Sequence, residues 1–197
     1  MISRKNHDGY RYHGWQRQND VNSVQQCLER ALSQVADVPI KVFCAGRTDA
    51  GVHASGQIVH FDSSNARPLH SWIQGTNTNL PDDIAIQWVH PVNERFHARF
   101  SAISRRYRYV IYNHPMRPAL MAKEVTWNYR PLNVMAMQSA AKYLVGEHDF
   151  SAFRATGCQA KTPIRRVHHL QIVQASHYII LDIRANAFLH HMIRNIA

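Results

Sequence analysis

The sequence of 197 residues lacks long apolar runs and has few cysteines. No segment approaches the roughly 18 uninterrupted apolar residues that a membrane-spanning helix needs, and the opening residues MISRKNHDGY contain no apolar signal core. The three cysteines, Cys27, Cys44 and Cys158, are far apart and form no CxxC pair. This pattern favours reduced thiols in a cytoplasmic protein over a disulfide framework or a zinc site.

Several common catalytic and phosphate-binding motifs are also missing. Neither GxxxxGK[ST] nor GxGxxG occurs, so nucleotide-driven chemistry lacks its usual glycine-rich loop. No Ser/His/Asp or Cys/His set stands out. His190 and His191 are adjacent, and from a helix they cannot both face one metal ion. A metal-dependent hydrolase that uses this His-rich tail is therefore only a third hypothesis.

Acidic residues are scarce beside basic ones. The chain has 13 Asp and Glu against 23 Lys and Arg, which gives a formal net charge of +10, and 18 of the basic residues are Arg. The planar guanidinium of Arg binds phosphate and stacks on bases, whereas the ammonium of Lys does neither as well. The excess favours an anionic partner, most plausibly nucleic acid, over the plainer alternative of a solubilising surface.

The hydrophobic pattern predicts a mixture of helices and strands. Residues 23–38 carry apolar side chains at helical spacing, with Ser23 and Gln26 placed as a capping box. Residues 105–113, RRYRYVIYN, alternate as a strand should, with Tyr107 on the face opposite to the flanking arginines. Without a regular alternation of strands and helices, the sequence favours an α+β fold with largely antiparallel sheets. A soft boundary near residue 103 divides it into halves 1–103 and 104–197.

Shorter runs of periodic apolar residues predict the other elements. Strands are expected at 41–45, 57–61, around 84–88, at 165–174 and at 178–185, and helices at 68–76 and 133–144. A final helix is expected to begin near Leu189.

The loop AGRTDAGVHASG, residues 45–56, places Arg47 and Asp49 between glycines directly after an apolar run. Gly46 and Gly51 let the backbone turn sharply there. A guanidinium near the carboxylate would keep Asp49 ionised and aimed, as a nucleophile or base requires. The alternative, an Asp that only bonds its own backbone turn, is equally compatible with the residues.

Two further positions have ambiguous roles. Tyr107 lies in an aromatic strand with interleaved arginines, a pattern found in nucleic-acid platforms and equally in ordinary sheet cores. Arg194 projects away from the apolar stripe of the last predicted helix and is available to an anion or a carboxylate.

Five segments in order resemble the TruA family of tRNA pseudouridine synthases. They are GYRYHGWQRQ at 9–18, AGRTDAGVHASGQIVHF at 45–61, RRYRYVIYN at 105–113, DFSAFRATG at 149–157 and NAFLHHMIRNI at 186–196. The resemblance implies a pseudouridine synthase fold, with two α/β halves of mainly antiparallel sheet flanked by helices around a central cleft. It also implies a homodimer that isomerises uridines at positions 38, 39 and 40, in the anticodon stem-loop of tRNA.

The resemblance assigns roles to the candidate residues. Asp49 matches the essential catalytic aspartate, and Arg47 is its motif partner near the substrate phosphate or base. Tyr107 matches the tyrosine that stacks on the target uracil, and Arg194 the basic residue that pairs with the aspartate. The reaction breaks N1–C1′ and forms C5–C1′ without net redox change, so no cofactor or metal is expected.

The two ends of the chain differ from the family pattern. Family members open with an apolar strand, whereas MISRKNH is too polar for a buried central strand, and the family continues past residue 196. The C-terminal half is therefore expected to be truncated. The second hypothesis is a catalytically idle RNA-binding fragment of the same fold.

Overall fold

The computed structural model describes residues 1–197, and its internal contacts divide the chain into two compact units. The N-terminal unit comprises Met1–Ala102 and the C-terminal unit Ile103–Ala197. None of the helices has both the length and the apolar character that crossing a membrane requires.

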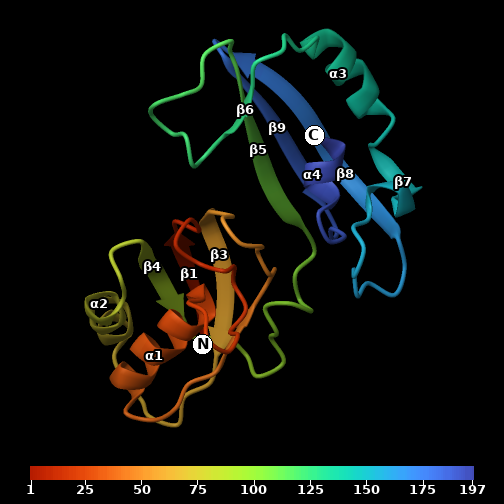
Figure 1. Cartoon of the computed structure of the whole chain (residues 1–197). Helices are drawn as coiled ribbons and strands as arrows, with labels where there is room; N and C mark the ends of the chain where they lie inside the picture. Colours follow the sequence, from red (N-terminus) through yellow and green to blue (C-terminus); the bar gives the residue numbers. More distant parts are fainter. The chain divides into compact units, whose positions relative to one another are not determined.

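The N-terminal unit is a four-stranded antiparallel sheet with two helices (Figure 1). In chain order its elements are β1 (Ile2–His7), α1 (Val24–Ala36), β2 (Val42–Cys44), β3 (Ala54–Phe61), α2 (Leu69–Asn79) and β4 (Ile84–His90). The strands lie side by side in the order β2-β3-β1-β4. The core forms where α1 and α2 cover one face of this sheet.

Helix α1 has the predicted N-terminal cap and the predicted apolar side. The side chain of Ser23 accepts a hydrogen bond from the backbone N–H of Gln26, as the predicted cap requires. Its apolar side, including Leu28 and Leu32, is fully buried in the core. The helix ends at Asp37, which adopts a left-handed conformation with φ of 57° before Pro39.

Strand β1 corrects the expectation that MISRKNH cannot be a buried central strand. The strand lies between β3 and β4 and pairs with both. The polar side chains of Ser3, Lys5 and His7 face the core and are buried. A central strand satisfies its backbone N–H and C=O groups on both edges, and this pairing holds β1 in place despite its polar side chains.

Two contacts offset part of the free-energy cost of burying Lys5. Its Nζ lies 4.3 Å from the centre of the Trp15 ring and 3.1 Å from Nδ1 of His7. A cation over an aromatic face and a hydrogen bond both reduce the cost of desolvating the ammonium group. Two other polar atoms of β1, the hydroxyl oxygen of Ser3 and Nε2 of His7, are buried without hydrogen-bond partners.

The C-terminal unit is a five-stranded sheet in the order β6-β5-β9-β8-β7. Its elements are β5 (Arg105–Asn113), β6 (Thr126–Asn128), α3 (Val134–Lys142), β7 (Gly146–Asp149), the 3-10 helix η1 (Ser151–Phe153), β8 (Ile164–Ala175), β9 (Tyr178–Ala185) and α4 (Met192–Ile196). All pairs are antiparallel except β5 with β6. Two mainly antiparallel sheets with helices confirm the predicted α+β class.

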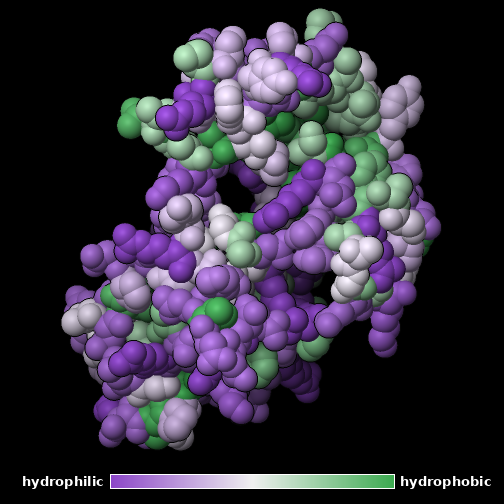
Figure 2. All heavy atoms as spheres, viewed as in Figure 1, coloured by the Kyte–Doolittle hydropathy of each residue, from purple (hydrophilic) through white to green (hydrophobic).

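Both α-helices of this unit cover the same face of its sheet. Side chains of α3 pack with Ile179 and Leu181, and those of α4 with Ile183 and Ala185, which share one side of β9. The opposite face, which we call the outer face, has no helix on it. Exposed apolar side chains of this unit gather elsewhere, around β6 and α3 (Figure 2), and include Leu120, Met121 and Met135.

Candidate active site

Asp49 lies in the tight loop that joins β2 to β3. The backbone N–H of Val52 donates to the carbonyl oxygen of Asp49 at 3.1 Å, and Gly51 takes a φ of 76°. The side chain of Asp49 is half-buried. The turn therefore presents a single carboxylate at the end of a buried strand, as the glycine spacing predicts.

Two glycines of the preceding segment allow close packing behind this loop. A Cβ on Gly14, whose φ is 86°, would lie 2.8 Å from the carbonyl oxygen of Thr48. A Cβ on Gly9 would overlap the carbonyl of Val52. The N–H of Trp15 also donates to the carbonyl oxygen of Thr48 at 2.9 Å. Gly9 and Gly14 support the loop in a way that was not predicted, although glycines in the dipeptides Asp8-Gly9 and His13-Gly14 indicate tight turns.

Arg47, the neighbour expected to hold Asp49, is arranged differently from the prediction. Arg47 is exposed and forms no salt bridge with Asp49, so its guanidinium does not hold the carboxylate. The hydroxyl of Thr48 is buried without a partner. Nδ1 of His53 lies 3.0 Å from Oδ1 of Asp8 and 3.3 Å from the backbone nitrogen of Gly9. The backbone turn, rather than an Arg47 ion pair, fixes where Asp49 lies.

Tyr107 belongs to β5, which has the predicted bounds. Its ring is half-buried and meets Phe188 edge to face, with ring centres 5.1 Å apart. It packs against the buried cluster that includes Ile183 of β9 and Met192 of α4. The ring thus has a defined position on the helix-covered face of the sheet, and one aromatic partner holds its angle.

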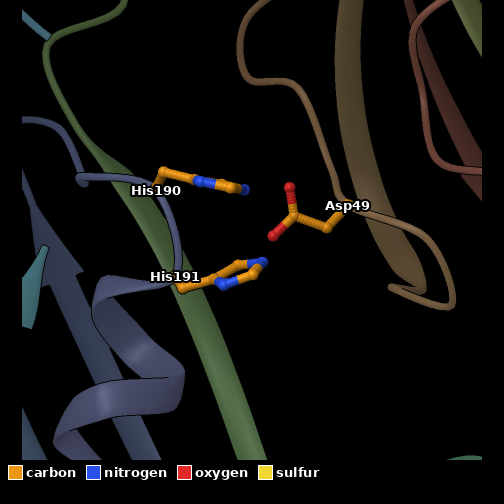
Figure 3. A group of neighbouring side chains, drawn as sticks. All are labelled: Asp49, His190 and His191. Carbon is orange, nitrogen blue, oxygen red and sulfur yellow. The ribbon is translucent and has the colours of Figure 1, made fainter. Parts of the chain in front are cut away.

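Arg194, His190 and His191 lie near the C-terminal end of the chain, in and just before α4. Arg194 is exposed in the last turn of α4. The helix begins later than expected, at Met192, because His191 adopts a left-handed φ of 57°. His190 and His191 therefore lie in the turn before α4, with ring centres 4.0 Å apart. Figure 3 shows the elements that carry these two rings and Asp49.

Neither His190 nor His191 belongs to a helix, so helical spacing does not prevent the two rings from facing one metal ion. Arg47 and Asp49 belong to the N-terminal unit, and Tyr107 and Arg194 to the C-terminal unit.

Comparison with known proteins identifies the family. A family described as tRNA pseudouridine synthase matches residues 5–101 and 140–197, and these ranges contain the Asp49 loop and α4. The chain belongs to the tRNA pseudouridine synthase family. Its members are isomerases.

Curated relatives agree over nearly the whole chain. The chain is 60% identical over 190 residues to a protein of Pseudomonas aeruginosa named tRNA pseudouridine synthase A. The aligned residues make up 96% of this chain and 67% of that protein. Proteins of the same name from Photorhabdus laumondii and Salmonella arizonae are 59% and 58% identical, with 72% and 70% of their lengths covered. The chain thus spans between 67% and 72% of the lengths of these relatives.

Proposed function

We propose that this chain isomerises uridine to pseudouridine in tRNA, at positions 38, 39 and 40 of the anticodon stem-loop, with Asp49 as the catalytic carboxylate. The observation that carries the proposal is the placement of Asp49 on a tight glycine turn in a chain of this family. The high positive charge supports an RNA substrate.

The chemistry needs only one well-placed carboxylate. The N1–C1′ bond breaks, the uracil turns, C5 bonds to C1′, and the proton lost from C5 is balanced by one gained at N1. An ionised Asp49 can attack C1′ or the base, or it can remove the C2′ proton to give a glycal. In each route the carboxylate acts on a nucleotide that has left its stack.

The other candidate residues serve binding in this proposal. Tyr107 stacks on the target uracil and offsets part of the unstacking cost, which is about a few kcal/mol. Arg194 binds an anionic group of the substrate. Arg47, which is exposed and forms no salt bridge with Asp49, is available to a phosphate or a base edge.

The cellular setting and assembly are part of the same proposal. Three free cysteines support a reducing, cytoplasmic location. The homodimer rests on the family resemblance, and light scattering of the purified chain measures it directly.

The substitution Asp49→Asn tests the role of the carboxylate. It keeps the size of the side chain and removes its charge, so pseudouridine formation should fall by at least about a thousandfold, as for the loss of a group that acts directly in the reaction. Binding of tRNA should change little, because Asp49 does not attract phosphates. Formation is measured on an unmodified tRNA transcript, and binding by filter retention.

Asp62→Asn is the matched control. Asp62 is an exposed residue of the same unit, outside the loop, and the substitution makes the same charge change. It should leave pseudouridine formation intact. If neither the unsubstituted chain nor Asp49→Asn forms pseudouridine while both bind tRNA, the idle RNA-binding alternative is favoured, and equal measurable rates for the two would contradict the role of Asp49.

A further inference from the structure

The outer face of the C-terminal sheet carries a cluster of three arginines around one carboxylate. Arg106 and Arg108 lie on β5, and Asp182 and Arg184 lie opposite them on β9. We call these four residues the arginine cluster. They face away from Tyr107, because side chains alternate along β5, and no helix covers them.

Asp182 fixes two of the three guanidinium groups. Arg106 donates to both carboxylate oxygens, each at 2.6 Å, and Nε of Arg108 donates to Oδ2 at 3.0 Å. The hydrogen bonds from Arg106 and Arg108 lower the pKa of the Asp182 carboxyl to about 2, so it is ionised at neutral pH. The aspartate is nearly buried, whereas the side chains of Arg106 and Arg108 are 57% and 65% exposed. Two guanidinium groups are thus held side by side with donors still facing solvent.

Arg184 adds a second positive charge opposite Arg106, and this repulsion destabilises the sheet when no anion is bound. Arg184 is directly opposite Arg106 across the strand pair, and its other cross-strand neighbour is His169. Like charges in directly opposed positions destabilise a sheet. Arg184 is exposed and forms no salt bridge, and Asp182 is the only acid among the four residues. The cluster therefore keeps a net charge of about +2, the unbalanced charge that a bound anion would neutralise.

We propose that the arginine cluster binds phosphate groups of the tRNA backbone. Planar, exposed and pre-positioned guanidinium groups suit the oxygens of a phosphate, and RNA presents phosphates in a row. The site lies on the opposite face of the sheet from Tyr107, so it holds a part of the tRNA other than the nucleotide that reacts. The identification of the anion as tRNA rests on the proposed function.

Arg184→Gln tests the cluster without disturbing the Asp182 hydrogen bonds. The dissociation constant for a full-length unmodified tRNA transcript should rise about threefold or more at near-physiological salt, because a backbone contact is lost. The slope of log Kd against log salt concentration should fall by about one, as one fewer counterion is released. Arg184→Lys, which keeps the charge, should retain most of the affinity and the original slope.

Arg117→Gln is the control for bulk charge. Arg117 is exposed in the loop after β5, at the other end of the sheet, and the substitution removes the same charge. It should leave the affinity nearly unchanged. The proposal is overturned if Arg184→Gln binds tRNA with the original affinity and slope, or if Arg117→Gln weakens binding equally.

The two proposals fail separately. A chain that binds tRNA through Arg184 yet forms no pseudouridine overturns the proposed function and leaves the cluster standing. A chain that forms pseudouridine while Arg184→Gln binds normally overturns the cluster alone.

Discussion

Gly14 and Gly51 both have positive φ values at the Asp49 loop, but their surroundings differ. At Gly14 an added Cβ would lie 2.8 Å from a backbone oxygen and 3.1 Å from a backbone carbon, whereas at Gly51 it would meet nothing within 4 Å. Backbone atoms cannot rotate out of the way as a flexible side chain can. Gly14 is therefore required both for its conformation and for the close approach of two segments.

The same substitution at both glycines separates these two costs. Gly51→Ala should lower the free energy of unfolding by about 1 kcal/mol, the cost of a left-handed conformation for a residue with a Cβ. Gly14→Ala should lower it by about 2–4 kcal/mol, because displacement of the Thr48 carbonyl adds to that cost. Urea denaturation measures both. Equal losses would contradict the close packing described for the loop.

At the scale of elements, β1 is the least conventional part of the fold. It fills the centre of a sheet with Lys5 and His7, whose side chains are buried. Burial lowers the pKa of Lys5 to about 7 and that of His7 to about 3. Both groups are therefore harder to protonate in the folded chain than in the unfolded one.

These pKa shifts set the sign of a pH effect. Between the folded pKa of Lys5, about 7, and its ordinary value of about 10.4, the unfolded chain binds more protons than the folded one. The free energy of unfolding should consequently fall as the pH drops from about 10 to about 7, by an amount on the order of a few kcal/mol. His7 should extend the fall from about pH 6.5 to about pH 3.

Lys5→Met isolates the contribution of Lys5. The variant should be more stable at pH 7, and its advantage should shrink as the pH rises towards the ordinary lysine pKa of about 10.4, above which Lys5 is neutral in both states. Urea denaturation followed by tryptophan fluorescence suits the measurement, since Trp15, Trp72 and Trp88 of the four tryptophans lie in the N-terminal unit. Lys41→Met, at an exposed lysine, is the control. A pH-independent gain for Lys5→Met would contradict the burial of the ammonium group.

The same elements show what the sequence could predict. Strands β5 and β9 were predicted with their observed bounds because their side chains alternate regularly, with one face apolar. Strand β1 was missed because its buried side chains are polar, and its place depends on partners distant in sequence. The short strands β6 and β7 were missed because three or four residues carry too little pattern. The start of α4 depends on one left-handed residue, His191, and the preference of His for this conformation is too weak to predict it.

The candidate site shows the same limit. The turn that presents Asp49 follows from its glycines, which act locally. The expected ion pair with Arg47 does not form, because adjacency in a loop does not fix the direction of a long, exposed side chain. The arginine cluster could not be predicted without the register of β5 and β9, because Asp182 and Arg108 are far apart in the chain.

At the scale of the whole molecule, charge and family point to the same substrate. The net charge of +10 favours a general attraction for RNA, and in the proposed function the Asp49 turn supplies the reacting group. The N-terminal unit carries Asp49, and the C-terminal unit carries Tyr107, Arg194 and the arginine cluster. In the proposed function each unit therefore contributes different residues.

One measurement tests the central claim most directly. The purified chain is incubated in excess with an unmodified tRNA transcript that has uridines in the anticodon arm, and pseudouridine is mapped along the RNA by carbodiimide modification and primer extension. The account predicts new pseudouridine at one or more of positions 38, 39 and 40, and none with Asp49→Asn. Absence of pseudouridine everywhere in the transcript, with the chain folded and the tRNA bound, would contradict it.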